Sequence, residues 1–185
     1  MGMQSDTHLV WMDLEMTGLD PEHDTILEIA TLVTTNELQL VAEGPVCAVH
    51  HPQSVLDAMD EWNRTHHGAS GLSARVVTSS TSLEQAEALT LAFVQQYCPE
   101  RTSPLCGNSI WQDRRFLARY MRQLEGYLHY RTIDVSTVKE LVRRWYPNGP
   151  PPPEKQHAHL ALDDIRESIA ELQFYREHYF VKVGS

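Results

Sequence analysis

The sequence contains no long apolar run, few cysteines and no broad excess of positive charge. None of its apolar stretches reaches the roughly 18 residues that a membrane-spanning helix needs, so no membrane partner is expected. The N-terminus lacks the basic-then-apolar pattern of a secretory signal. Three cysteines are too few and too scattered for a disulfide framework. These absences predict a cytoplasmic protein with reduced thiols.

The net charge of −10 argues against a protein that grips long nucleic acids, because such proteins usually present a broad basic surface. The exception is the segment 113–144, which holds eight Lys and Arg residues against four acids. A basic segment on an otherwise acidic chain favours a short anionic ligand over a long one. The alternative is that these side chains form a solvent-exposed helix face.

Hydrophobic patterning predicts an α/β fold with a mixed sheet flanked by helices. Three runs rich in Val, Ile, Leu and Thr predict strands near 8–15, 26–36 and 38–49. Further strands and helices are expected in this order: a helical stretch 55–79 interrupted by Gly68 and Gly71, a helix to Tyr97 after a Ser82-x-x-Gln85 capping box, a strand 105–108, a helix 112–124, a strand 130–135, a helix capped by Ser136 and running to Trp145, and a helix 160–178. A strand meander followed by alternating helices and strands indicates this mixed architecture.

The length of 185 residues suits one well-packed domain and is short for two. We assign that single domain to residues 8–180. Residues 1–7 are predicted to be a disordered or cloning-derived N-terminus, and residues 181–185 a C-terminal tail.

Five residues carry the chemistry that the sequence suggests. Asp13 and Glu15 close an apolar run, and alternate residues of a strand point to the same side, so both carboxylates face one place. Two like charges held there repel each other unless a cation lies between them. Hard oxygen ligands suit Mg²⁺ or Mn²⁺, which complete their shell with a substrate phosphate. Asp113, His159 and Asp164 are further candidates for a two-metal phosphoryl-transfer site.

The spacing near the C-terminus leaves two acids in competition. His159 and Asp164 are separated by roughly 140° on an ideal helix, so they converge only if His159 lies at or before the helix start. Asp163, four residues after His159, would share its face. Periodicity does not decide between the two acids.

Three segments resemble the exonuclease motifs of the DEDDh superfamily: Asp13-Leu-Glu15-Met-Thr-Gly-Leu19, Gly107-Asn-Ser-Ile-Trp-Gln-Asp113-Arg-Arg-Phe-Leu117 and His159-Leu-Ala-Leu-Asp-Asp164. Others are similar to the oligoribonuclease family within it: Asp60-Glu-Trp-Asn63, His129-Tyr-Arg131, Asp134-Val-Ser-Thr137 and Asp164-Ile-Arg-Glu-Ser168-Ile-Ala-Glu-Leu172. The likeness covers residues 8–179. It implies a ribonuclease H-like fold, a homodimer, and 3′→5′ removal of nucleoside monophosphates from very short single-stranded RNAs, dinucleotides especially.

The resemblance also implies roles for individual residues. It selects Asp164 over Asp163, makes His159 the general base, and lets four carboxylates hold two divalent ions, Mg²⁺ or Mn²⁺: Asp13, Glu15, Asp113 and Asp164. The substrate contacts that it implies are Leu19 as a wedge against a base, Trp62 stacking on a base, His67 at the 3′-terminal sugar, Ser109, Arg131 and Ser136 at the 5′ phosphate, and Tyr130 from the partner subunit. A cap on the 5′ phosphate explains a dinucleotide preference, because a longer chain has no exit past it.

Two other functions are alternatives. The first is a DEDDh exonuclease that acts on longer single-stranded DNA or RNA, and the acidic composition and the Tyr130-Arg131 cap argue against it. The second is a non-catalytic nucleotide-binding module on the same fold, which would require a missing ligand, although all five groups are present. The alternative for Trp62 is core packing, and for Arg131 a surface ion pair.

Overall fold

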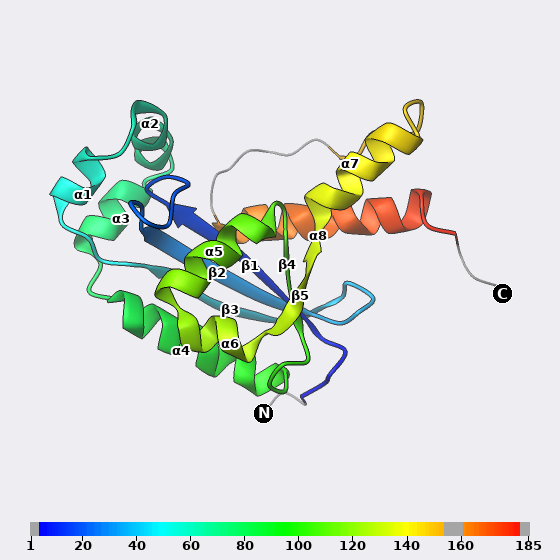
Figure 1. The fold of residues 1–185 in the computed structure, drawn as a ribbon, viewed down its shortest axis with the longest axis horizontal. Helices are drawn as coiled ribbons and strands as arrows, with labels where there is room; N and C mark the ends of the chain where they lie inside the picture. Colours follow the sequence, from blue (N-terminus) through cyan, green and yellow to red (C-terminus); the bar gives the residue numbers. More distant parts are fainter. Residues whose placement is uncertain (1–3, 154–160, 182–185) are drawn as a thin grey trace.

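The computed structural model describes residues 4–153 and 161–181, which form a five-stranded sheet with helices on both faces (Figure 1). The strand order is β3-β2-β1-β4-β5. The first three strands pair antiparallel, and the last two add in parallel. The strands are β1 (Leu9–Met16), β2 (Ile26–Thr34), β3 (Leu40–Ala48), β4 (Pro104–Gly107) and β5 (His129–Asp134). This mixed sheet confirms the predicted fold class.

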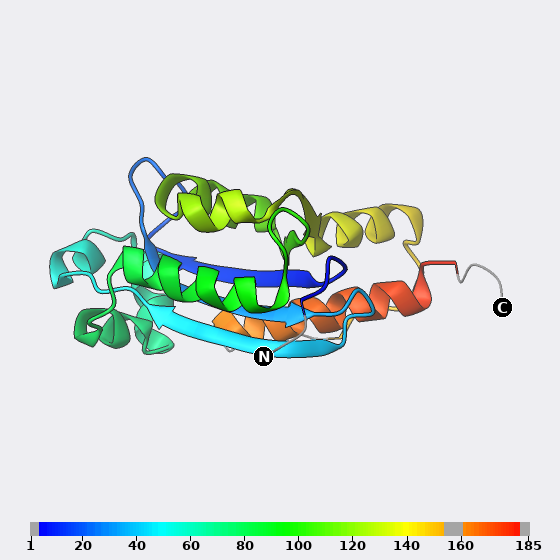
Figure 2. The same ribbon diagram turned by 90° about the horizontal axis from the view of Figure 1, so that it is seen from below.

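The helices form two layers and one end group. Figure 2 shows α4, α5 and α6 over one face of the sheet and α8 along the other, while α1 to α3 gather at the end of the sheet where β1 finishes (Figure 1). The helices are α1 (Gln53–Asp57), α2 (Glu61–Ala69), α3 (Leu72–Thr78), α4 (Leu83–Tyr97), α5 (Ile110–Tyr120), α6 (Arg122–Tyr127), α7 (Val135–Trp145) and α8 (Ala161–His178). In the part of the chain that the structure describes, no helix is both long and apolar enough to cross a bilayer.

The alternation of side chains along β1 decides where the acids point. Even-numbered residues within Val10–Leu14 belong to the core that α4, α5 and α6 cover. The odd-numbered Trp11 belongs to the other core, which α8 covers. Because successive strand residues face opposite sides, Asp13 and Glu15 continue the row of Trp11 toward α8.

Two helix boundaries differ from the expected ones. The predicted helix 112–124 is two helices, because the buried Met121 leaves the helical conformation (φ −130°, ψ 61°) between α5 and α6. The expected capping by Ser136 is also wrong. Asp134 caps α7 instead, since its carboxylate accepts the N–H of Ser136 at 2.9 Å.

The glycines of the helical stretch after β3 behave differently from each other. Gly68 lies inside α2 and does not interrupt it. Gly71 precedes α3 with a positive φ of 74°, a conformation that glycine adopts without strain. The capping box before α4 is confirmed, because Ser82 and Gln85 exchange both of its hydrogen bonds.

The predicted limits of the domain near residues 8 and 180 stay predictions. Part of the N-terminal segment has a place in the fold, since the Ser5 N–H donates to the Tyr97 carbonyl at 3.0 Å. At the other end, α8 finishes at His178.

Candidate active site

Three carboxylates meet where β1 ends. Asp13, Glu15 and Asp164 each offer one oxygen, and these oxygens all lie within 4.8 Å of one another. The first two come from alternate positions of β1, and the third comes from the first turn of α8. Negative groups this close are stabilised by a cation between them, and carboxylate oxygens are the donors that Mg²⁺ and Mn²⁺ prefer. The residues therefore fit the divalent metal that the sequence predicts.

The neighbouring acid Asp163 takes a different partner. Its carboxylate accepts a hydrogen bond from Arg166 Nη1 at 3.0 Å, within the same helix. The geometry therefore brings Asp164, and not Asp163, to Asp13 and Glu15.

Asp113 is held against the backbone of β1 from the first turn of α5. Its side chain is buried, and its Oδ1 accepts the N–H of Leu14 at 2.9 Å. Because β4 pairs only with an earlier part of β1, this N–H is left for the carboxylate. The bond holds Asp113 beside the peptide that links Asp13 and Glu15, close enough for its charge to act on Glu15, although Asp113 is not part of the group of three acids whose oxygens lie within 4.8 Å of one another.

Burial changes the protonation of two of these acids. It raises the pKa of Glu15 to about 8, and the nearby charge of Asp164 acts in the same direction. Burial also raises the pKa of Asp113 to about 7, although the Leu14 N–H lowers it. In the cation-free protein burial therefore favours the protonated form of both carboxyls, and a divalent ion would have to displace those protons.

Glu28 is part of this environment, although no sequence pattern singled it out. It lies opposite Glu15 in the register of β1 and β2, is 1% exposed, and pairs with Arg75 Nη1 at 2.8 Å. Its charge helps to raise the pKa of Glu15, and that of Arg75 lowers it. A single acid within the otherwise apolar run 26–30 is the signal that could have identified it.

The two histidines of the predicted site have different outcomes. His159 lies outside the described residues, so its role as general base stays a prediction. The buried His67 has Nε2 at 2.9 Å from the Met16 carbonyl oxygen, which requires the ring proton on that nitrogen. Its Nδ1 is 3.8 Å from Glu15 Oε2, and burial lowers the pKa of the ring. A neutral His67 therefore borders the acid cluster, and its contact with the 3′-terminal sugar stays a prediction.

Leu19 and Trp62 line a common pocket of about 620 Å³. Leu19 lies in the loop after β1 and is 70% exposed, while Trp62 lies in α2 and is 62% exposed. The Trp62 ring stacks on His66, with ring centroids 3.8 Å apart. Such exposure rules out core packing for Trp62 and leaves one face of its ring available to a ligand.

Ser109 and Ser136, both expected at the 5′ phosphate, contact each other through their hydroxyls at 3.2 Å. Asp134 organises the pair, because its Oδ1 accepts the N–H of Ser109 at 3.0 Å and that of Ser136 at 2.9 Å. No sequence pattern assigned a separate role to Asp134. The signal is its spacing, since an Asp side chain commonly accepts the N–H two residues later.

Tyr130 and Arg131 lie together on β5, the edge strand of the sheet. The Arg131 guanidinium is 5.2 Å from the centroid of the Tyr130 ring, which is 71% exposed. Arg114 supports this strand, because its Nη1 donates to the carbonyls of both residues at 3.0 and 3.4 Å. The structure therefore presents an aromatic ring and a cation on one exposed edge.

This fold, together with the acids gathered at the end of its central strand, indicates that the protein belongs to the class of exonucleases. The family model described as Exonuclease matches residues 10–172, and the chain belongs to this exonuclease family. Solved structures agree on the fold. Escherichia coli exonuclease I in complex with a 5cy-dT13 oligonucleotide superposes with a TM-score of 0.74 at 15% identity, over 96% of this chain and 42% of that one. The likeness shows the ribonuclease H-like fold, and this chain spans about two fifths of that larger protein.

Curated relatives narrow the class to the oligoribonucleases. The oligoribonuclease of Pseudomonas aeruginosa strain PAO1 is 59% identical over 177 residues, which cover 96% of this chain and 98% of the relative. That of Alcanivorax borkumensis strain SK2 is 61% identical over 172 residues, which cover 93% and 95%. The resemblance found in the sequence motifs is therefore confirmed along nearly the whole chain.

Proposed function

We propose that this chain is a 3′→5′ exoribonuclease that degrades short oligoribonucleotides, dinucleotides especially, to 5′-mononucleotides. The observation that carries the proposal is the meeting of Asp13, Glu15 and Asp164 beside Asp113, in a chain 59% identical to an oligoribonuclease. The relatives' name favours short RNA over the longer strands of the first alternative. The acid cluster argues against the second alternative, a non-catalytic module.

Each acid has a defined part in this proposal. Asp13, Glu15, Asp113 and Asp164 would hold two divalent ions, Mg²⁺ or Mn²⁺. Bound ions of this kind lower the pKa of water and stabilise developing negative charge. The hydrogen bond that the Leu14 N–H donates to Asp113 keeps that carboxylate in place before any ligand arrives. His159 would accept the proton of the attacking water as general base.

The substrate would lie across the three groups of predicted contact residues. Trp62 offers an exposed ring face, which can stack on any base and so implies little sequence preference. Leu19, which lines the same pocket, would separate one base from the next. The 5′ phosphate would meet the hydroxyls of Ser109 and Ser136 together with the cation of Arg131.

A homodimer is part of the proposal. Tyr130 projects from an edge strand, where it would reach the site of a second subunit. The neighbouring α7 exposes apolar side chains that suit a subunit interface, namely Leu141, Trp145 and Tyr146. Light scattering at micromolar protein should give a dimer mass, and a monomer would contradict this part. A cytoplasmic location is also proposed, on the ground that the three cysteines are free and buried.

The direct test follows a 5′-labelled diribonucleotide with Mg²⁺, and compares RNAs from two to ten nucleotides long. We expect the rate per molecule to be highest for the dinucleotide. Asp164→Asn removes a predicted metal ligand, so the cleavage rate should fall by more than about 100-fold. Loss of a group that only supports a metal ligand already costs up to roughly that factor. Asp163→Asn is the matched control, because this adjacent acid pairs with Arg166 and should keep nearly full activity. An intact dinucleotide, or equal cleavage of a long strand, would contradict the proposal.

A further inference from the structure

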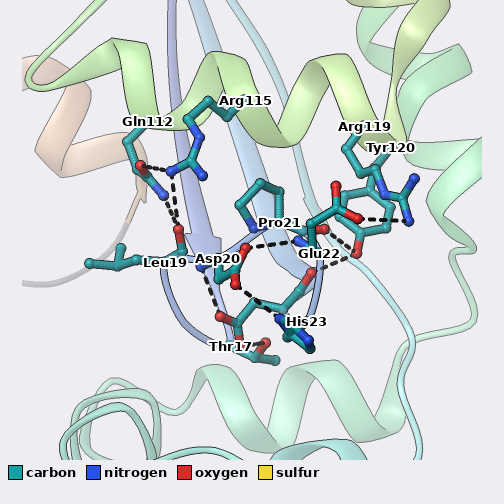
Figure 3. Close-up of polar contacts among 11 residues, drawn as sticks. Thr17, Leu19, Asp20, Pro21, Glu22, His23, Gln112, Arg115, Arg119 and Tyr120 are labelled. Atoms are coloured by element: carbon teal, nitrogen blue, oxygen red, sulfur yellow. Dashed lines mark hydrogen bonds and ion pairs between the residues drawn. The ribbon is translucent and has the colours of Figure 1, made fainter.

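The loop that carries Leu19 is held from above by α5 (Figure 3). Gln112 Nε2 donates a hydrogen bond to the Leu19 carbonyl at 2.5 Å. Arg115 Nη1 donates to the same oxygen at 3.4 Å. Since the Leu19 side chain is 70% exposed and has little packing of its own, its position depends on these two hydrogen bonds to its backbone carbonyl.

The two donors also hold each other. Gln112 Oε1 accepts a hydrogen bond from Arg115 Nη1 at 2.8 Å, so the amide of Gln112 cannot flip without losing both of its bonds. Gln112 is only 8% exposed, which restricts its side chain further. The Arg115 guanidinium lies 5.9 Å from the centroid of the Trp111 ring, a contact that gives this otherwise unassigned tryptophan a part in the arrangement.

One helix therefore reaches both parts of the site. Gln112 and Asp113 are neighbours in the first turn of α5, and they bond to backbone atoms on either side of the end of β1. Asp113 contacts the Leu14 N–H beside the acid cluster, and Gln112 contacts the Leu19 carbonyl in the loop beyond it. A helical turn is rigid on this scale, so it fixes the separation between the acids and Leu19.

We propose that Gln112 and Arg115 are positioning residues that hold Leu19 at a set distance from the acid cluster, and that this distance determines the enzyme's efficiency on dinucleotides. The inference rests on the proposed function, in which Leu19 separates the two bases. If the wedge moves, the phosphodiester between those bases moves relative to the acids. Misplacement of a reacting group by about 1 Å can lower a rate about 100-fold.

The rest of the loop has independent supports. Asp24 accepts hydrogen bonds from Thr17 Oγ1 and from the Asp20 N–H, both at 2.9 Å. The Tyr120 hydroxyl donates to the Asp24 carbonyl at 2.6 Å (Figure 3). Removal of the bonds to Leu19 should therefore displace that residue without unfolding the loop.

The test uses the double variant Gln112→Met with Arg115→Met, which keeps side-chain bulk and removes the donors. Its kcat/KM for a diribonucleotide should fall about 10-fold to 100-fold. Hydrolysis of the p-nitrophenyl ester of thymidine 5′-monophosphate, which has one base and needs no wedge, should stay within about threefold, since the acids are untouched. Arg119→Met is the matched control from the same helix. It removes only an exposed ion pair with Glu22 at 3.7 Å, and should leave both rates unchanged.

Two further variants separate positioning from a general structural effect. Gln112→Glu keeps the length and the bond to Arg115 but cannot donate to Leu19, so it should reproduce the selective loss if the double variant proves unstable. Combination of Leu19→Ala with the double variant should give no more loss than Leu19→Ala alone, because residues that act through one group are not additive.

The outcomes distinguish this inference from the function on which it rests. If the wild-type enzyme leaves the diribonucleotide intact, the proposed function fails and the inference falls with it. If the wild type cleaves it and the double variant matches Arg119→Met, or if the losses multiply with Leu19→Ala, only the positioning role is overturned. Equal losses on both substrates would also overturn it, since they would indicate damage to the acid cluster itself.

Discussion

Binding of a divalent cation to the acid cluster should release protons at neutral pH. Burial raises the pKa of Glu15 to about 8 and that of Asp113 to about 7. At pH 7 a carboxyl with the higher value is about nine-tenths protonated, and one with the lower value about half protonated. A cation that needs both carboxylates ionised should therefore displace about 1.4 protons at pH 7 and about 0.1 at pH 9.

The same protons make the metal affinity depend on pH. Competition between cation and protons at Glu15 and Asp113 weakens binding as the pH falls. The apparent affinity for the cation should therefore rise steeply between pH 6 and pH 8 and change little above pH 9.

Titration calorimetry with Mg²⁺ or Mn²⁺ in two buffers of different ionisation enthalpy measures the protons released. In the Glu15→Gln variant, cation binding should release only about half a proton at pH 7, which is the contribution of Asp113. Asp163→Asn is the control. It should release as many protons on cation binding as the wild type, because this acid lies outside the cluster. Cation binding without proton release, or an affinity equal at pH 6 and pH 8, would refute the claim that these buried carboxyls receive the metal.

Further expectations concern stability, the loop and stacking. The folded-state pKa of Glu15, about 8, exceeds its ordinary value of 4.5, so its stabilising contribution is complete below pH 4.5 and is lost as the pH rises through 8. Thermal melting in the presence of a chelator should show the melting temperature falling over this pH range, and Glu15→Gln should make that fall smaller. Gly18→Ala should slow dinucleotide cleavage, because the added Cβ would collide with the Asp24 carboxylate, and unchanged kinetics would contradict the rigid loop. Gly68→Ala meets open space inside α2 and should stabilise the fold by about 0.5–1 kcal/mol in urea denaturation. Trp62→Ala should raise KM for the dinucleotide by the equivalent of about 1–3 kcal/mol, while Trp62→Phe retains most of the affinity, and equal KM values would exclude stacking.

Local patterns identified most of the fold. The three long strands are confirmed because each lies in a segment rich in Val, Leu, Ile or Thr, and the capping box before α4 is confirmed because it depends on residues three apart. The break at Met121 was not predictable in this way. The break accompanies the burial of Met121 in the core that α4, α5 and α6 cover, which is a tertiary contact.

The sequence by itself determined the family of this protein and predicted its reacting groups. Asp13 and Glu15 share a face because strand side chains alternate, and that rule needs no knowledge of the rest of the molecule. Periodicity left Asp163 and Asp164 in competition and only the family resemblance selected Asp164; the tertiary structure brings Asp164 to the other two acids, since the rotation of α8 against the sheet depends on the packing of both.

Only the tertiary structure decided the contacts that hold the site. Gln112 and Leu19 are 93 residues apart, and no periodicity relates a side-chain amide in one element to a carbonyl oxygen in a distant loop. The same holds for the bond between Asp113 and Leu14. Local spacing determines the direction of a side chain within its own helix or strand, whereas its partner depends on how those elements pack together.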